Sequence, residues 1–220
     1  MAPSLKQSQG LRRLRAVFYR HWHRTKILRR GTSHIVRLND SLLHRCKIEL
    51  LGNNNNLEIG AGARLWDVTI RLIGDGLHCQ IGSQCRLRGG QYLLEDHGSR
   101  LEIGSSATIF SPMIVVCESG NIRIGNDCLI AYGTDIRNSD AHSILEATTR
   151  ARINPAADVV IADHVWIGNG AQILKGVEIG PHAIVAARSV VTKNVAAGTL
   201  VAGLPAHVIR ENVDWDHRRL

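Results

Sequence analysis

Residues 161–196, IADHVWIGNGAQILKGVEIGPHAIVAARSVVTKNVA, repeat an aliphatic side chain at every sixth position. The aliphatic positions are Ile161, Ile167, Ile173, Ile179, Val185 and Val191, and four places after each stands Val165, Ala171, Val177, Ala183, Ser189 or Val195. A period of six fits neither the two-residue rhythm of a strand nor the 3.6-residue rhythm of a helix. It predicts a triangular coil in which each side points one aliphatic inward and each corner takes a small residue.

Earlier in the chain an Ile-Gly pair recurs at Ile59, Ile81, Ile103 and Ile124, at intervals of 22, 22 and 21 residues. The polar stretches GNNNN, GDGLHC, EDHGSR and ESGN stand before these pairs and supply turn residues. Self-similarity at this period indicates an all-β solenoid whose coils stack by parallel strand pairing. We expect about eight coils between residues 34 and 202. A β-sandwich would need alternating strands with turns every 8–12 residues or so, and that pattern is missing.

The gross composition bounds the class of protein. The chain has 220 residues and no apolar run near the roughly 20 residues of a membrane span. Its first residues lack the apolar core of a signal peptide, so we expect a soluble, cytoplasmic protein. The five cysteines form no CxxC pair, and Cys85 and Cys128 stand at the small-residue position of a coil. We therefore expect buried thiols, with neither disulfides nor a zinc site.

Positive charge gathers at the front of the chain. Residues 1–50 hold 12 Lys or Arg against 2 Asp or Glu, whereas residues 51–220 hold 15 against 17. Residues 11–30 predict a short basic helix with Leu11, Leu14, Phe18 and Trp22 on one side. Two roles remain open for this segment: it covers the end of the solenoid, or it meets an acidic glycan or an anionic membrane face. Nucleic-acid binding is not expected, because the rest of the chain is not basic.

These patterns divide the chain into a basic N-terminal segment (1–33), a solenoid (34–203) and a C-terminal tail (204–220). The repeat breaks once inside the solenoid. Its aliphatic positions run Ile124, Ile130 and Ile136, but the next one is His142, and the rhythm resumes only at Ile161. We expect a loop at about 143–158. A loop leaving a rigid scaffold is a common place for a site, and a neutral imidazole suits proton removal from a hydroxyl.

Three motifs add a family resemblance: SDAHSI at 139–144, HVWIG at 164–168, and VVTK at 190–193 followed by AGLPA at 202–206. In this order they resemble the hexapeptide-repeat acyltransferases over about residues 34–213. The nearest types are sugar and capsular polysaccharide O-acetyltransferases, including those for galactosides and polysialic acid. The resemblance implies a left-handed parallel β-helix, an exception to the right-handed crossover rule. It also implies a homotrimer and acetyl-CoA as the donor.

The resemblance further implies roles for individual residues. His142 matches the family's catalytic histidine, a general base for an acceptor hydroxyl whose oxygen attacks the thioester directly. Trp166 would line the cleft with its indole N–H toward the thioester or oxyanion, although a packing role is the alternative. Asp140 would hold the imidazole tautomer or serve as an ordinary turn residue. Asn138 and Ser139 are candidates to contact the acceptor.

For the donor, the resemblance implies pantetheine contacts along Asn169, Gly170, Ala186 and Ala187, and contacts near the nucleotide from Thr192, Lys193 and Arg210. The alternative for the charged ones is plain surface charge. This sequence departs from the family pattern twice. His207 stands where Lys or Arg is usual, and Arg188 stands where Gly is usual.

The expected activity is acetyl-CoA-dependent O-acetylation of a sugar hydroxyl, in a bacterial surface or capsular polysaccharide or its precursor. An N-acetyltransferase of an amino sugar is one alternative. A non-catalytic or metal-binding protein of the γ-carbonic anhydrase type is another, because His164 and His182 lie 18 residues apart and should stack at one corner. No third ligand is evident from the sequence, so no metal is predicted.

Overall fold

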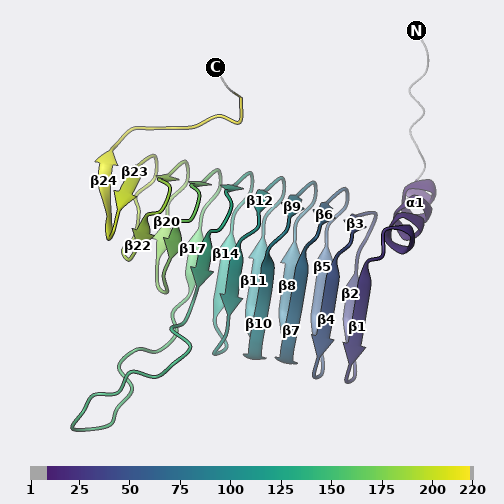
Figure 1. The fold of residues 1–220 in the computed structure, drawn as a ribbon, viewed down its shortest axis with the longest axis horizontal. Helices are drawn as coiled ribbons and strands as arrows, with labels where there is room; N and C mark the ends of the chain where they lie inside the picture. The colour runs from purple at the N-terminus through teal and green to yellow at the C-terminus, as the bar shows by residue number, and fades with distance from the viewer. Residues whose placement is uncertain (1–8, 219–220) are drawn as a thin grey trace.

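In the computed structural model, which describes residues 9–218, stacked coils form a three-sided prism (Figure 1). Each side is one sheet, and the chain visits the sides in the order C, A, B in every coil. Sheet A contains β1 (Lys26–Arg30), β4 (Lys47–Leu51), β7 (Thr69–Asp75), β10 (Gln91–His97), β13 (Met113–Val116), β16 (Asp135–Arg137), β19 (Gln172–Ile173) and β22 (Val190–Val191).

Sheet B contains β2 (Ile35–Arg37), β5 (Asn56–Ile59), β8 (His78–Ile81), β11 (Arg100–Ile103), β14 (Asn121–Ile124), β17 (Val159–Ile161) and β20 (Glu178–Ile179). Sheet C contains β3 (Leu42–His44), β6 (Arg64–Trp66), β9 (Arg86–Arg88), β12 (Thr108–Phe110), β15 (Leu129–Ile130), β18 (Trp166–Ile167), β21 (Ile184–Val185), β23 (Leu200–Gly203) and β24 (Ala206–Arg210). Every strand pairing is parallel except that of β23 with β24. The predicted left-handed parallel β-helix of about eight turns is confirmed.

The strand register reproduces the spacing of the repeats. Leu57 pairs with Cys79 at an offset of 22, Leu101 with Ile122 at 21, and Ile161 with Ile179 at 18. Between β14 and β17 the offset rises to 37, since Ile122 pairs with Val159. The extra residues form the loop between Arg137 and Val159, so the chain leaves the prism and returns in register.

The prism interior is a single column of aliphatic side chains. All six aliphatic positions of residues 161–196 and all six small positions are buried. The five cysteines are also buried and free, which confirms that they fill space in the coils. Burial raises the pKa of Cys79 to about 12 and that of Cys128 to about 11, so these thiols stay protonated and unreactive.

The backbone angles at the corners of the prism explain why turn-forming residues recur in the sequence. At the corner between sheets C and A, each coil has a residue with a positive φ at the same position: Arg45, Asp67, Gly89, Ser111, Gly133, Gly170 and Arg188. Side chains other than Gly, Asn and Asp resist this backbone conformation. Arg188 has this positive φ, which explains why Gly is usual at this position. The arginine found here instead carries some backbone strain.

The N-terminal region differs from its prediction. Helix α1 spans Gln9–Trp22 and ends where His23 N donates to Tyr19 O, and residues 26–30 form β1 rather than more helix. The solenoid thus begins ahead of the predicted boundary at 34. Helix α1 packs beside β3 through Ala16, which is fully buried. Its apolar side chains Leu14, Phe18 and Trp22 are instead exposed.

Within the described residues, no helix has the length and apolar character to cross a membrane. Within the predicted C-terminal tail, residues 206–210 form β24. Beyond β24 the chain turns back and runs along the prism toward the N-terminal coils (Figure 1).

Candidate functional site

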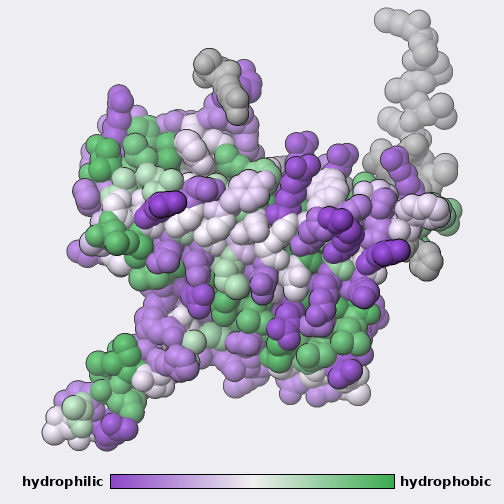
Figure 2. All heavy atoms as spheres, viewed as in Figure 1, coloured by the Kyte–Doolittle hydropathy of each residue, from purple (hydrophilic) through white to green (hydrophobic). Residues whose placement is uncertain are grey.

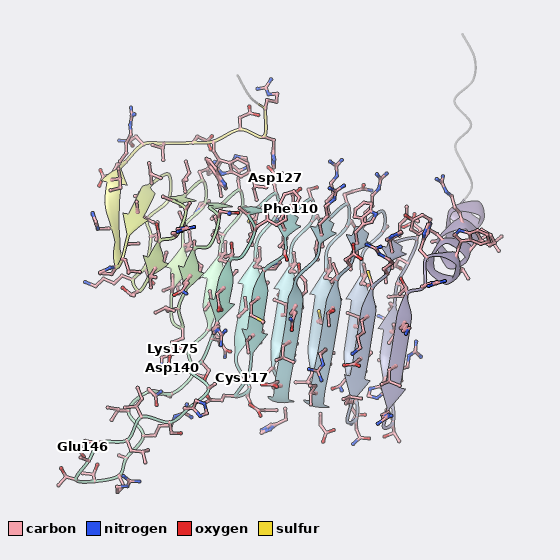
Figure 3. All side chains as sticks on the ribbon, viewed as in Figure 1. Phe110, Cys117, Asp127, Asp140, Glu146 and Lys175 are labelled. Carbon is pink, nitrogen blue, oxygen red and sulfur yellow. The ribbon has the colours of Figure 1, made fainter. Side chains whose placement is uncertain are left out.

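The loop at the break in the repeat projects from the corner between sheets A and B (Figure 1). It is a two-armed excursion, because Leu145 and Arg152 form an antiparallel bridge and Ile153 N donates to Ile144 O. Figure 3 shows Glu146 at the far end of the loop, with Asp140 and Lys175 close together at its base. The loop residue His142 is exposed on the outgoing arm.

One polar cluster holds the two arms together. Glu118, in the preceding coil, accepts hydrogen bonds from Ser139 Oγ on the outgoing arm and from Arg152 on the returning arm, at 2.5 Å to Nη1 and 2.9 Å to Nη2. Hydrogen bonds from Arg152 and then from Ser139 lower the pKa of Glu118 to about 2. The carboxylate therefore stays charged across the physiological range and keeps the base of the loop closed.

A second cluster sets the backbone at His142. Asn154 Nδ2 donates to Asp140 Oδ2 at 2.7 Å and to the carbonyl of His142 at 2.8 Å. Lys175 Nζ donates to the same Asp140 oxygen at 2.6 Å and to the Asn154 carbonyl at 3.0 Å. Lys175 first, and Asn154 second, lower the pKa of Asp140. The return arm and the next coil thus fix where His142 leaves the prism.

The predicted contact between Asp140 and the imidazole is not formed. Within residues 9–218 no side chain or backbone group hydrogen-bonds to the His142 ring, and Asp140 binds Lys175 and Asn154 instead. Asp140 therefore positions the loop rather than the imidazole tautomer. Sequence reasoning missed Lys175 and Asn154, although the shift of 37 between β16 and β19 would have placed Lys175 one coil beyond Asn138.

The two residues predicted to contact the acceptor, Asn138 and Ser139, lie at the base of the loop. Asn138 is fully buried, with Cys117 N donating to its Oδ1 at 2.9 Å and its Nδ2 donating to the Cys117 carbonyl at 2.8 Å. Ser139 is 6% exposed, and its hydroxyl bonds Glu118 and the backbone of Ala141. Both side chains therefore hold the loop to the preceding coil.

Trp166 lies on a different side of the prism from His142. It begins β18 on sheet C, flanked by Leu129 and Ile184 in the neighbouring strands, and is 39% exposed. In a triangular prism the corner between sheets A and B lies opposite sheet C. The two predicted catalytic residues of one chain therefore face away from each other.

The predicted donor residues fall into three places. Asn169, Gly170, Ala186 and Ala187 come together at the corner between sheets C and A, where Arg188 N donates to the Asn169 carbonyl at 2.8 Å. Gly168 allows the close approach of these coils, because a Cβ there would lie 2.6 Å from Ala187 N.

Thr192 and Lys193 line a second place, a hollow of about 520 Å³ between the end of β22 and the hairpin of β23 and β24. His207 lies in the same wall. Arg210 is at the end of β24, paired with Leu200, outside the lining of this hollow. The hollow thus combines apolar walls with one cation, whereas Arg210 lies apart.

Known acetyltransferases are similar to this chain in sequence. The family model for bacterial transferase hexapeptide repeats, with six repeats, matches residues 158–193. A polysialic acid O-acetyltransferase of Escherichia coli O1:K1 / APEC is 36% identical over 118 residues, which are 54% of this chain and 38% of that protein. One of Neisseria meningitidis is 35% identical over 136 residues, 62% of this chain and 63% of that protein. The chain thus spans less than two thirds of either curated relative.

Two solved structures match over most of the chain. The polysialic acid O-acetyltransferase OatWY has a TM-score of 0.86 and 31% identity, over 89% of this chain and 93% of that one. The polySia-specific acetyltransferase NeuO has a TM-score of 0.83 and 30% identity, over 88% of this chain and 83% of that one. The likeness therefore extends well beyond the residues that the family model matches.

Proposed function

This chain belongs to the hexapeptide-repeat transferase family, and on that premise we propose that it moves an acetyl group from acetyl-CoA to a hydroxyl of a sugar. The acceptor we propose is a bacterial surface or capsular polysaccharide or its precursor, and the cytoplasm is the proposed compartment. The observation that carries the proposal is His142: it stands where the repeat breaks, on a loop tied by two polar clusters, with its ring exposed.

In the proposed reaction, His142 acts as a general base. One ring nitrogen takes the proton of the acceptor hydroxyl as the oxygen attacks the carbonyl carbon of the thioester. The new C–O bond forms, the C–S bond breaks, and the thiolate of CoA leaves and takes up a proton. The buried thiols are protonated and enclosed, which supports direct transfer without an acyl-enzyme.

The proposal includes a homotrimer with a cleft between neighbouring chains. His142 and Trp166 face opposite ways in one prism, so a cleft that uses both needs a loop from one chain and sheet C of another. Ile144 and Ile153 are exposed on the loop, and Figure 2 shows hydrophobic atoms along this projecting arm. Apolar side chains on an extended arm gain stability by packing on a neighbour.

The test is thiol release from acetyl-CoA in the presence of a panel of bacterial polysaccharides. The wild-type protein should release thiol with at least one acidic or neutral glycan, and His142→Gln should abolish release while the oligomer stays intact. The control is His97→Gln, an exposed histidine at the same corner two coils earlier. Near-normal turnover by the His142 variant would remove it as the base.

Lys193 tests the donor side of the proposal separately. Lys193→Ala removes the one lysine in the wall of the hollow, so it should raise the KM for acetyl-CoA more than that for the sugar. Arg210→Ala is the comparison, since Arg210 lies outside this wall. An equal change in the KM for acetyl-CoA and the KM for the sugar would show that Lys193 does not contact the donor.

A further inference from the structure

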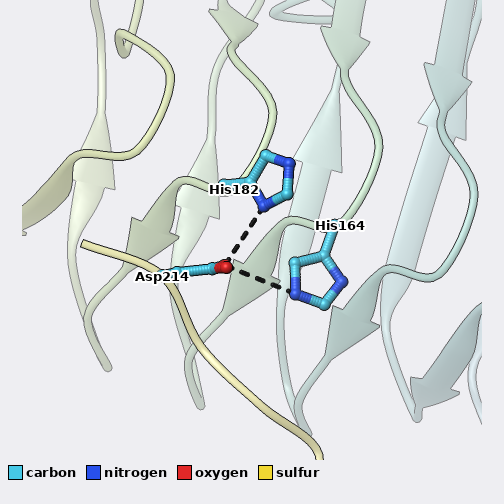
Figure 4. A group of neighbouring side chains, drawn as sticks. All are labelled: His164, His182 and Asp214. Carbon is cyan, nitrogen blue, oxygen red and sulfur yellow. Dashed lines mark hydrogen bonds and ion pairs between the residues drawn. The ribbon is translucent and has the colours of Figure 1, made fainter. Parts of the chain in front are cut away.

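The chain after β24 returns across the corner between sheets B and C, where two histidines stack. His164 and His182 occupy the same corner position in consecutive coils, both with a positive φ, and their ring centroids are 5.1 Å apart. The returning segment brings Asp214 between them, as Figure 4 shows. Asp214 Oδ1 lies 3.1 Å from His182 Nδ1 and 3.5 Å from His164 Nε2.

These spacings are those of metal ligands. The three ligand atoms all lie within 4.8 Å of one another. Zinc bond lengths of about 2.0–2.1 Å place the corners of a tetrahedron about 3.3–3.4 Å apart, close to the two distances from Asp214. Two imidazoles and a carboxylate form a ligand set that zinc accepts, with the fourth position open to water. The side chains of His182 and Asp214 are more than half exposed, so an ion can enter.

A second group orients the more buried ligand. Asp127, in the coil before His164, lies 2.7 Å from His164 Nδ1 and also 3.1 Å from His217 Nε2. A carboxylate on one ring nitrogen directs the other nitrogen, Nε2, toward the ion and increases its basicity. His164 Nε2 also lies 3.0 Å from the Trp215 carbonyl.

We infer that His164, His182 and Asp214 bind a divalent cation of the zinc class, which fastens the C-terminal segment to two coils of the prism. Trp215 is already seated there: its ring stacks on His164 at 4.3 Å, and its Nε1 donates to the His164 carbonyl at 2.7 Å. The ring centroids of Trp215 and Trp166 are 6.2 Å apart. The ion would thus order the segment that borders Trp166 on sheet C.

The experiment uses the full-length chain without an affinity tag, stripped with a chelator and titrated with Zn²⁺ at pH 7.5 against a chromophoric competitor. Wild type should bind one Zn²⁺ per chain, with a rise in Tm and a change in tryptophan fluorescence. Asp127→Asn should weaken binding about 10–100-fold, as loss of a supporting carboxylate does elsewhere. His182→Asn and Asp214→Asn should weaken it further.

Asn suits position 182, because it tolerates a positive φ, and Asn at 214 can still accept the hydrogen bond that Trp215 N donates to Asp214 Oδ1. Both variants should therefore fold, which circular dichroism checks. His97→Asn, at a different corner, is the control and should bind like wild type. Absence of Zn²⁺ binding by wild type, or unchanged binding by His182→Asn, would overturn the inference and leave an ionic contact that needs no metal.

Discussion

Tyr92 is completely buried, and its hydroxyl has no hydrogen-bond partner within the described residues. It stands on β10 at a position that points into the prism, where other coils carry Ile48, Ile70 or Ile114. Burial raises its pKa well above the usual value, so the phenol remains neutral. A buried polar group without a partner costs free energy that an apolar residue of the same shape does not.

Tyr92→Phe should therefore raise the free energy of unfolding, by about 1–2 kcal/mol, since it removes an unsatisfied hydroxyl and keeps the ring. Urea unfolding followed by far-ultraviolet circular dichroism measures the change. Tyr132→Phe is the control, because Tyr132 is half exposed and should give little change. A loss of stability in Tyr92→Phe would mean that the hydroxyl has a partner, such as a buried water.

Glu118 links both arms of the projecting loop, and its low pKa predicts how that link depends on pH. Its pKa falls from 4.5 to about 2, first because of Arg152 and then because of Ser139. A carboxylate with a depressed folded-state pKa stabilises the fold above pH 4.5, and the contribution disappears as the pH falls toward 2.

Glu118→Gln should lower the free energy of unfolding at pH 7 by about 1 kcal/mol, a modest value because solvent screens a partly exposed pair. The difference between variant and wild type should shrink between pH 4.5 and pH 2. Urea unfolding at pH 7 and at pH 3 provides the two measurements. A difference that grows in acid would contradict the assignment of the low pKa to Glu118.

At the scale of the element, the glycine that follows each inward isoleucine has a steric reason. A Cβ built on Gly82 would lie 2.5 Å from the carbonyl carbon of Gly104 in the next coil, and Gly104 and Gly125 show the same crowding. None of these three glycines has a positive φ. The repeat therefore needs glycine there because stacked coils approach closely. The glycines at the corner between sheets C and A (Gly89, Gly133 and Gly170) are instead needed for their positive φ.

Gly82→Ala should destabilise the protein by about 2–3 kcal/mol, because the added methyl group meets backbone that cannot move aside. Gly98→Ala is the matched control: its Cβ would meet nothing within 4 Å, but its φ is +68°. We expect a smaller loss, about 1 kcal/mol, from that strain alone. Thermal and urea unfolding compare the two, and equal losses would show that coil spacing is not the cause.

At the scale of the whole molecule, the prism separates the groups that the proposed reaction needs. His142 leaves the corner between sheets A and B, and Trp166 lies on sheet C opposite that corner. A triangular cross-section keeps them apart in one chain, however the loop bends near its base. Assembly around a three-fold axis would turn sheet C of one chain toward the loop of the next.

Mixing two inactive variants tests this arrangement. His142→Ala and Trp166→Ala homotrimers should each turn over poorly, but a refolded equal mixture should regain activity. Random assortment leaves about one cleft in four with both wild-type groups, so we expect about a quarter of the wild-type rate. A mixture as inactive as its parents would place both groups in one chain, and near-normal turnover by the Trp166→Ala homotrimer would place Trp166 outside the cleft.

By itself, the sequence determined the solenoid. The six-residue period requires three short strands per coil, and only a stacked triangular coil buries all of those aliphatic side chains. The fold, the approximate number of coils and the burial of the cysteines could therefore be predicted. It also located His142, because a broken period is visible in one dimension. The helix end was misjudged, since basic residues 26–30 fit a helix locally but pair with β4 instead.

Only the tertiary structure decided what the loop and tail residues touch. Asp140 bonds Lys175 and Asn154, Asn138 turns inward onto Cys117, and Asp214 meets His164 and His182, across separations of 14 to 50 residues. The physical reason is that the contacts of an irregular segment depend on the shape and charge of the surface against which it packs. A period specifies neighbours only where the chain keeps it.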